Sequence, residues 1–309
     1  MSGIAHVLIP AAVVLDYFAG DPHGLPHPVR LVGAVIDRLE RLARRQRLVS
    51  LRTFGMLAVL GLAGTAWLVV DALCALPGVG WLLVLYFAYA GLALGCLLRE
   101  GREVIRLLDL GDLPGARDAV AGLVSRDAAA LDEAGVRRAL AETLAENLND
   151  GFSAPLFWLA FLGPEGLWAY KVVSTFDSMW GYRTEECRDL GRFGARLDDV
   201  LAYVPARLTA AALLLAGKFL GLHPVRWNDV AADARKMDSP NAGWPMAAAA
   251  WLLEARMGGP TVYFGSVKDK PALGPEGEWS GERLARLPRL LTVSSVILVV
   301  ALQLAAAAI

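Results

Sequence analysis

The chain has 309 residues, of which 56% are hydrophobic and 20% are charged, and its formal net charge is −1. Soluble domains rarely reach this balance, so the composition argues against an ordinary water-soluble fold. The cysteines, Cys74, Cys96 and Cys187, have no metal-type spacing, which disfavours a zinc site or a disulfide framework.

Hydrophobic residues gather into runs about as long as the roughly 20 residues that a helix needs to cross a bilayer. Strong runs occupy Phe54–Leu76, Gly80–Leu98, Val200–Leu222 and Leu290–Ile309. Weaker runs, which are short or interrupted, occupy Ile4–Ala19, Phe152–Val173 and Trp244–Leu253. We therefore expect an all-α, polytopic helical membrane protein with about four or five spans, in which the weaker runs are re-entrant or interfacial. Whether the first run spans or folds back is open, and no signal-peptide features mark it for removal.

Basic residues predict the orientation of these spans. Arginines crowd the stretch from Arg38 to Arg52, whereas the turn Ala75–Gly80 carries no charge. Cytoplasmic loops carry an excess of Lys and Arg, so this stretch is expected in the cytoplasm and the protein in the cytoplasmic (inner) membrane. The basic run has no interleaved aromatic residues, so it does not indicate nucleic-acid binding.

The segment 99–150 is the only long polar stretch between the runs. We interpret it as a cytoplasmic helical insertion within a single integral-membrane domain, 1–309. Apolar residues recur every four positions at Val136, Leu140, Leu144 and Leu148, and charged residues recur on the roughly opposite side at Arg138, Glu142, Glu146 and Asp150. This pattern predicts an amphipathic helix with a carboxylate-rich face. The stretch Lys268–Arg289, rich in Gly, Pro and charge, is typical of a surface loop.

Four polar clusters lie beside the runs, where an unpaired charge is costly and is usually retained for a purpose. The first extends from Asp16 through Asp21 to Arg30. Prolines on both sides of His27 would hold its imidazole and Arg30 in a rigid turn, which suits an anion or a proton carrier. The alternative is a loop in which Asp16 or Asp21 caps a helix.

The second cluster runs from Glu142 to Gly151. Glu142 and Glu146 are one helical turn apart, so they can share a divalent cation, with Asn147 or Asp150 adding oxygen ligands. A nearly equal alternative is a solvated face with an Arg138–Glu142 pair.

The third cluster fills the stretch 174–208 between two apolar runs. Its acids, which include Asp177, Asp198 and Asp199, suit Mg²⁺. Its arginines suit bidentate recognition of carboxylate or phosphate, and they are Arg183, Arg196 and Arg207. Structural ion pairing would account for a part of this density.

The fourth cluster spans Ser239 to Pro245 and is followed by Gly258-Gly259-Pro260. These prolines and glycines demand a specific backbone path, and Asn241 offers both a donor and an acceptor. Trp244 also suits an interfacial anchor.

Taken in order, these clusters resemble adenosylcobinamide-phosphate synthase, the membrane protein of cobalamin biosynthesis called CobD or CbiB. The resemblance covers nearly the whole chain through GDPHGLPHPVR at 20–30, SRD at 125–127, ETLAENLNDGFSAPLFW at 142–158, STFDSMWGYRTEE at 174–186, GARLDDVLAYVPARL at 194–208 and SPNAGWPMA at 239–247. It implies an ATP-dependent amide ligation of adenosylcobyric acid with (R)-1-amino-2-propanol or its O-phosphate. The product is adenosylcobinamide or its phosphate.

The resemblance implies the positions, and the roles of the residues are our inference. The sequence has no familiar nucleotide-binding signature, so ATP use would depend on acids, Mg²⁺ and arginines that activate the carboxylate as an acyl phosphate. We expect catalytic roles for Asp177, Glu146, Asp198 and Arg183. Substrate or phosphate binding is expected of His27, Arg30, Asn147, Arg196, Arg207 and Asn241. Metal binding is expected of Asp21, Glu142, Glu146, Asp150 and Asp199.

The implied cofactors are ATP and Mg²⁺, and the implied substrates are a corrinoid and aminopropanol or its phosphate, met at the cytoplasmic face. Other enzymes of the cobalamin pathway are the expected protein partners. The chain departs from the family pattern at Ser174, at Ala202 or Tyr203, and at Met237-Asp238. These departures keep open a corrinoid-binding or transport protein without ligase activity, and a scaffold for soluble pathway enzymes is a third reading.

Overall fold

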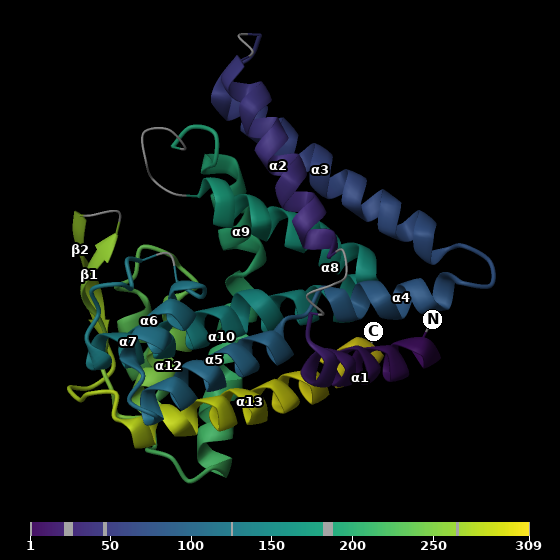
Figure 1. Ribbon diagram of the computed structural model, residues 1–309. Coiled ribbons are helices and arrows are strands. Elements are labelled where there is room, and N and C mark those ends of the chain that lie inside the picture. The colour runs from purple at the N-terminus through teal and green to yellow at the C-terminus, as the bar shows by residue number, and fades with distance from the viewer. Residues whose placement is uncertain are drawn as a thin grey trace. The chain divides into compact units, whose positions relative to one another are not determined.

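The computed structural model describes residues 2–21, 27–45, 48–124, 126–181, 188–263 and 266–308 (Figure 1). In chain order the elements are α1 (Ser2–Ala19), α2 (Pro28–Arg45), α3 (Leu51–Cys74), α4 (Gly80–Ala90), α5 (Leu94–Asp109), α6 (Leu113–Ala121), α7 (Glu133–Leu148), the π-helix η1 (Asn149–Ser153), α8 (Ala154–Trp180), α9 (Arg192–Leu201), α10 (Tyr203–Phe219), α11 (Trp227–Ala234), α12 (Gly243–Leu252), β1 (Met257–Tyr263), β2 (Ser266–Leu273) and α13 (Gly281–Ala307). The expected all-α fold is confirmed, with one antiparallel hairpin, β1–β2, added to it.

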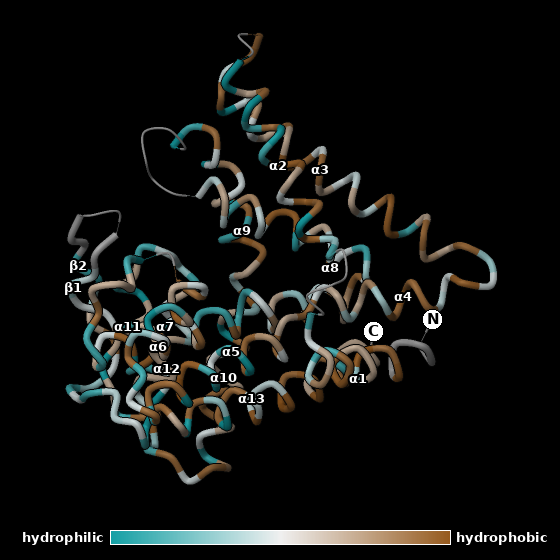
Figure 2. Tube along the Cα trace, in the orientation of Figure 1, coloured by the Kyte–Doolittle hydropathy of each residue, from teal (hydrophilic) through white to brown (hydrophobic). Residues whose placement is uncertain are grey.

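Three helical segments of the described chain are long and apolar enough to cross a membrane, and they are Leu51–Cys74, Gly80–Asp109 and Gly281–Ala307. A fourth is obtained when α9 and α10 are taken together as one bent span. Figure 2 shows the hydrophobic stretches along α3, α4 and α13. The protein is therefore a polytopic helical membrane protein, with three or four spans in its described part against the four or five expected.

The strong run Val200–Leu222 accounts for part of the difference, because α10 reaches span length only when it is joined to α9. The weaker hydrophobic runs add no span among the described residues. The apolar part of α1, Val7–Ala19, is too short to meet the same criterion. The run within α8 is broken where Gly163 adopts a φ of 70° before Pro164, which has no N–H to continue the helical bonding. The ten residues of α12 are almost entirely buried within protein.

The chain divides into two compact units. The first contains α1 to α4, α8 and α9, and the second contains α5 to α7, η1, α10 to α12, the hairpin and most of α13. The segment 99–150 is helical, as expected, and belongs to the second unit together with residues 203–301.

The core of the first unit forms where α2, α3 and α8 pack together. Ile36, Val59 and Phe176 are fully buried there. Gly55 of α3 allows the backbone after α8 to come close, because a Cβ at this position would lie 2.1 Å from the Leu190 carbonyl oxygen. The missing side chain therefore sets how closely α3 can approach this backbone.

The second unit is built around α7, which contacts α5, α6, α12 and β1. Asp132 caps its N-terminus by accepting a hydrogen bond of 2.7 Å from the Gly135 N–H. The predicted apolar face is buried, and on the opposite face Glu142 is only 1% exposed, while Arg138, Glu146 and Asp150 are half-buried. The alternative of a solvated carboxylate face is therefore wrong at Glu142, because neighbouring elements enclose the helix on both sides.

The hairpin corrects the interpretation of Lys268–Arg289 as a loop. Residues 266–273 form β2, in which Asp269 pairs with Pro260 and Lys268 with Thr261 of β1. From Gly281 onward the chain is already α13. The Gly, Pro and charged residues hid a strand whose stability comes from cross-strand pairing, a non-local interaction that composition does not report.

Candidate functional site

A buried carboxylate lies at the middle of α7. The Glu142 side chain is 2% exposed, and its Oε2 forms an ion pair with Nη2 of Arg126, whose side chain is 5% exposed. The other oxygen, Oε1, accepts a hydrogen bond of 2.8 Å from the Gly258 N–H. A buried ion pair is tolerated only when further hydrogen bonds offset the cost of removing its charges from water. Both Glu142 oxygens meet this condition, and the partner is Arg126 rather than Arg138.

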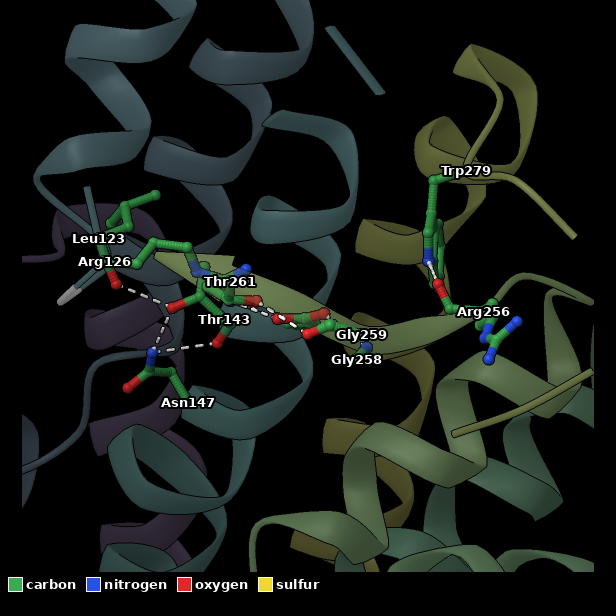
Figure 3. A network of polar contacts seen from close by, with 10 residues as sticks. Leu123, Arg126, Thr143, Asn147, Arg256, Gly258, Gly259, Thr261 and Trp279 are labelled. Atoms are coloured by element: carbon green, nitrogen blue, oxygen red, sulfur yellow. Dashed lines mark hydrogen bonds and ion pairs between the residues drawn. The ribbon is translucent and has the colours of Figure 1, made fainter. Parts of the chain in front are cut away.

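Gly258 owes its place opposite Glu142 to its backbone conformation. Its φ is +86°, a region that side chains rarely adopt, and a Cβ there would lie 2.0 Å from the Pro271 carbonyl oxygen. Figure 3 shows Gly258 and Gly259 in the strand that passes beside α7, with Thr261 donating to the Gly259 carbonyl at 3.2 Å. Further along, the Trp279 indole N–H donates to the Arg256 carbonyl at 3.0 Å. These bonds position the Gly258 N–H.

A second set of bonds holds Asn147 (Figure 3). Its Nδ2 donates to the Thr143 carbonyl at 3.0 Å and to Thr143 Oγ1 at 2.9 Å. The Thr143 hydroxyl in turn donates to the Leu123 carbonyl at 2.8 Å, which ties the segment before Arg126 to α7. Both bonds use the amide nitrogen, and the Asn147 Oδ1 accepts no hydrogen bond from the described residues. A half-buried acceptor is thus available to a ligand.

Glu146 follows Glu142 by one helical turn and is half-buried. Burial raises the pKa of its carboxyl group, and Glu142 raises it further, while Lys270 and Arg126 lower it. No hydrogen bond or ion pair joins this carboxyl group to another described residue. Glu146 is therefore the acid of α7 that is available to exchange a proton with a ligand.

The π-helix η1 follows directly, within the Asn-Asp-Gly-Phe-Ser sequence. Pro155 has no N–H and its ring would crowd the carbonyl four residues before it, so a wider turn at this point relieves the conflict. Ser153 Oγ donates to the Leu148 carbonyl at 3.0 Å. Buried Asn149 accepts from the Thr209 hydroxyl at 3.3 Å, and its Nδ2 donates to Asp150 at 2.8 Å. Short π-helical segments of this kind are frequent at functional sites.

Arg207 of α10 is held between two aromatic rings. Its Cζ lies 3.3 Å from the Tyr203 ring centroid and 4.7 Å from that of Trp244. Nη1 donates to the Tyr203 carbonyl at 2.6 Å and to Asn241 Oδ1 at 3.1 Å, and Nη2 donates to the Pro240 carbonyl at 3.2 Å. A guanidinium has five N–H donors, so the remaining ones stay available to a carboxylate or phosphate.

Trp244, considered as an interfacial anchor, is buried at 6% exposure beside Arg207. The turn before it is formed by Ser239, whose Oγ accepts from the Asn241 and Ala242 N–H groups at 3.3 Å each. The prolines and glycines of this cluster therefore position an aromatic ring and an amide against Arg207.

The predicted residues thus separate into two groups. The second unit brings together Glu142, Glu146, Asn147, Asp150, Arg207 and Asn241, through α7, η1, α10 and the 239–244 turn. The first unit contains Asp21, His27, Arg30, Asp177, Arg196, Asp198 and Asp199. Arg183 lies outside the described residues.

In the first unit His27 stands at the start of α2. Its Nδ1 accepts from the Val29 N–H at 3.3 Å, and its Nε2 lies 3.3 Å from Asp21 Oδ1. The imidazole is thus held at the start of α2, and Pro26, one of the two prolines expected to hold it, lies outside the described residues. Arg30 is exposed on the first turn of α2. Asp177 lies near the end of α8, where its carbonyl accepts from the Gly181 N–H at 2.7 Å.

The expected metal ligands form no single cage. Among the described residues no group of three or more His, Cys, Asp and Glu side chains is arranged to hold a metal. Asp21 and Asp199 belong to the first unit, and both Glu142 oxygens already have donors. Mg²⁺ at phosphoryl-transfer sites is commonly held by one or two carboxylates plus substrate phosphates. The donor set does not suit an all-protein site, and Glu146 and Asp150 are the acids of this centre that could take part in the substrate-assisted mode.

Arg126, Tyr203 and Lys270 were not anticipated as site residues. Arg126 belongs to the quoted Ser-Arg-Asp motif, so a signal for it was present. Tyr203 was noted only as a departure beside the Pro-Ala-Arg-Leu motif. Lys270 lies in the stretch interpreted as a loop, and only the folding of β2 brings its charge toward Glu146.

The fold and this polar centre define a polytopic helical membrane protein with a helical unit that carries a charged, partly buried site. A family model described as CobD/Cbib protein matches residues 9–291. The chain is 38% identical over 300 residues to cobalamin biosynthesis protein CobD of Citrobacter koseri, covering 93% of this chain and 92% of the relative. The CobD of Rhodobacter capsulatus is 41% identical over 280 residues, covering 85% and 84%.

A third relative, cobalamin biosynthesis protein CbiB of Salmonella typhimurium, is 38% identical over 304 residues, with 96% of this chain and 95% of the relative covered. No solved structure matches the chain. The chain belongs to the CobD/CbiB family.

Proposed function

We propose that this protein acts in cobalamin biosynthesis as a ligase that joins adenosylcobyric acid to (R)-1-amino-2-propanol or its O-phosphate through an amide bond. The observation that carries the proposal is the convergence of three motif segments, 142–151, 203–209 and 239–244, within one unit. That convergence leaves a half-buried carboxyl group, an amide oxygen and a stacked guanidinium available to ligands. The family membership supports the pathway.

The chemistry that we propose has two steps. The corrinoid carboxylate attacks the γ-phosphate of ATP, which gives an acyl phosphate and ADP. The uncharged amine then attacks the acyl carbon, the C–N bond forms, inorganic phosphate leaves, and the nitrogen gives up a proton. Mg²⁺ bound with the nucleotide would neutralise phosphate charge.

We assign to Glu146 the removal of the proton from the amine nitrogen. A general base works best when its pKa approaches the operating pH, and burial raises the pKa of this carboxyl group in that direction. Lys270 and Arg126 act in the opposite direction and lower the pKa of this carboxyl group, because their positive charges favour its ionised form. Asn147 Oδ1 is the neighbouring acceptor that would orient the amine.

Arg207 is assigned to anion binding. Its stacking between Tyr203 and Trp244 and its bond to Asn241 fix the plane of the guanidinium before any ligand arrives. A fixed fork loses less entropy on binding a carboxylate or phosphate than a mobile one. The catalytic roles expected of Asp177, Asp198 and Arg183 stay predictions, because none of these residues is part of the arrangement described around α7.

We place the enzyme in the inner membrane with the Arg38–Arg52 stretch at the cytoplasmic face. ATP and a large corrinoid are both available on that side. This placement depends on the positive-inside rule applied to the basic residues of that stretch, which include Arg44 and Arg45 in the last turn of α2.

The direct test is turnover by the purified protein in lipid nanodiscs. Supplied with adenosylcobyric acid, Mg-ATP and either amine, it should release ADP and phosphate and yield the amide product by mass spectrometry. Omitting the amine should stop product formation and leave corrinoid binding unchanged. Corrinoid binding without product from either amine would instead support the binding or transport alternative.

A further inference from the structure

The outer face of α2, in the first unit, carries a row of three arginines. Arg38, Arg41 and Arg45 are exposed, and their spacing of three and four residues places them on one side of the helix. The opposite side faces inward, because Ile36 and Ala43 are buried in the core that α2 shares with α3 and α8. The packing of α2 therefore holds these three residues, here called the arginine row, toward the outside.

The charge of the arginine row is only partly balanced. No hydrogen bond or ion pair joins its guanidinium groups to another described residue. Of the acids of α2, Glu40 accepts a bond of 2.6 Å from Arg44, and Asp37 is exposed beside the row. Three guanidinium groups and one carboxylate leave a formal charge of about +2 on this face at neutral pH. Arginines at this spacing also repel one another, so a bound anionic surface would stabilise the row.

The row lies close to the point where a membrane span begins. The helix α3 is long and apolar enough to cross a bilayer, and it lies beside α2 (Figure 1). The five residues between Arg45 and Leu51 can extend over about 20 Å at most, so the end of α2 stays near the start of α3. Clusters of basic residues next to a transmembrane helix typically attract anionic headgroups. The arginine row is therefore within reach of the headgroups around α3.

Exposed leucines accompany the arginines at this end of α2. Leu42, one helical turn from both Arg38 and Arg45, is 52% exposed, and Leu48, in the connection to α3, is 93% exposed. Burial of such side chains at the boundary between headgroups and acyl chains stabilises membrane contact, and it adds to the attraction between basic residues and anionic lipids. A nucleic acid would match the arginines and leave the leucines in water. The combination of charge and apolar surface therefore favours a lipid partner.

We propose that the arginine row binds the headgroups of anionic phospholipids, of the phosphatidylglycerol class, while Leu42 and Leu48 enter the boundary with the acyl chains. The phosphate diester of such a lipid offers the oxygens that guanidinium groups bind. Phosphatidylcholine has a headgroup without net charge, so the row attracts it less. This surface is separate from the polar centre around α7, and the inference does not depend on the proposed ligase function.

Lipid titrations followed by native mass spectrometry test the proposal on the full-length protein in detergent. The wild type should bind phosphatidylglycerol about tenfold or more tightly than phosphatidylcholine with the same acyl chains. Arg41→Gln should weaken phosphatidylglycerol binding about fivefold, the effect expected for one basic residue near an anionic surface. Combining Arg38→Gln, Arg41→Gln and Arg45→Gln in one triple Gln variant should abolish the preference. The preference should also fall as the salt concentration rises.

Matched variants separate charge from structure. Replacing the same three arginines by lysine keeps the charge and should retain most of the preference, because attraction to an anionic surface depends on charge. Arg235→Gln removes an exposed arginine of the second unit and should change nothing. Equal wild-type affinity for the two lipids, or an undiminished preference in the triple Gln variant, would overturn the proposal. Thermal unfolding shows that each variant is folded, and Arg41→Gln alone decides if the triple Gln variant is not.

A label at Leu48 supplies an independent measurement. In a variant whose native cysteines are replaced by serine, a fluorescent dye on Leu48→Cys should be quenched by headgroup spin labels in phosphatidylglycerol nanodiscs, and a dye on Arg235→Cys should not. An unquenched dye at position 48 would overturn the membrane contact. RNA or an acidic polypeptide bound by the wild type and lost in the triple Gln variant, without any lipid preference, would overturn the lipid assignment. Neither measurement needs turnover, so each outcome stands whether or not the ligase function is correct.

Discussion

Gly258 and Glu142 lie 116 positions apart in the chain, and the Gly258 N–H donates a hydrogen bond of 2.8 Å to Glu142 Oε1. Arg126 occupies the other carboxylate oxygen. One buried side chain therefore ties the β1–β2 hairpin and the segment before α7 to the middle of that helix. The position of Glu146, one turn further along, depends on this tie.

Replacing Arg126 by Ala should destabilise the protein strongly. The change leaves the buried Glu142 charge without its partner, and such losses cost about 3–5 kcal/mol. The free energy of unfolding in denaturant, measured in detergent, reports the loss. Arg226→Ala, which breaks an exposed pair with Asp229, is the control and should change little. Similar unfolding midpoints for the two variants would contradict the importance of the buried pair.

Gly258→Ala should be more damaging than an ordinary glycine substitution. The left-handed backbone costs an L-residue about 1–2 kcal/mol, and the new Cβ would also collide with the Pro271 carbonyl oxygen. Gly111→Ala separates the two effects, because Gly111 has a φ of +73° with open space around it. We expect Gly258→Ala to lower the thermal midpoint further than Gly111→Ala does. Equal shifts would mean that the hairpin adjusts freely.

Glu146→Gln should make the protein more stable at neutral pH. Because burial raises the pKa of this carboxyl group, the folded state binds more protons than the unfolded state between the ordinary value of 4.5 and the raised one. Stability is then lost as pH rises through that window. The variant should therefore gain stability above the window and match the wild type below it. Asp118→Asn, an exposed change on α6, serves as the control in the same pH series.

The same Glu146→Gln change should reduce ligation. Loss of a general base typically lowers the rate by about 10²–10⁴-fold, and the acidic limb of the kcat profile should disappear with it. Corrinoid binding should persist, because the substitution keeps the size of the side chain. Unchanged kcat across the pH range would remove Glu146 from the mechanism, whatever its effect on stability.

Arg207→Lys should impair activity although the charge is retained. Lysine has no planar fork to stack between Tyr203 and Trp244, and it cannot reproduce the bonds to Asn241 and the Pro240 carbonyl. A loss of about 10- to 100-fold in kcat/KM follows from one or two charge-assisted bonds. Lys218→Gln, near the other end of α10, should leave kcat/KM unchanged. A fully active Arg207→Lys enzyme would show that the planar guanidinium group is not required.

The predicted orientation can be tested by cysteine labelling in a variant whose native cysteines are replaced by serine. Arg45→Cys at the end of α2 and Val79→Cys in the turn before α4 are both exposed. In intact spheroplasts a membrane-impermeant maleimide should label position 79 and reach position 45 only after lysis. The reverse pattern would place the Arg-rich stretch outside.

The strong hydrophobic runs were predictable because crossing a bilayer is a property of about 20 consecutive residues. The run 54–76 became α3, 80–98 became the first part of Gly80–Asp109, and 290–309 became most of α13. The run 152–173 was less informative, since composition does not report that Gly163 and Pro164 interrupt α8. The hairpin was missed because strand pairing depends on residues far apart in sequence.

The contacts of the candidate site also divide into those that the sequence predicted and those that it did not. Helical spacing alone placed Glu142 and Glu146 on one face, since residues four apart are neighbours on a helix. It also suggested Arg138 as the partner of Glu142, which is wrong, because the chain before α7 folds back to supply Arg126 instead. The contact between Arg207 and Asn241 joins residues 34 positions apart, and no periodic pattern reports such a distance.

By itself the sequence determined the membrane character, the helical class and the family motifs, all of which depend on local composition or on short runs of residues. Only the tertiary structure decided which charges are neutralised and which remain available. Both oxygens of Glu142 are occupied by Arg126 and Gly258, whereas the side chains of Glu146 and Arg207 remain partly exposed. The reason is that the energy of a charge depends on its three-dimensional neighbours and on the water they exclude.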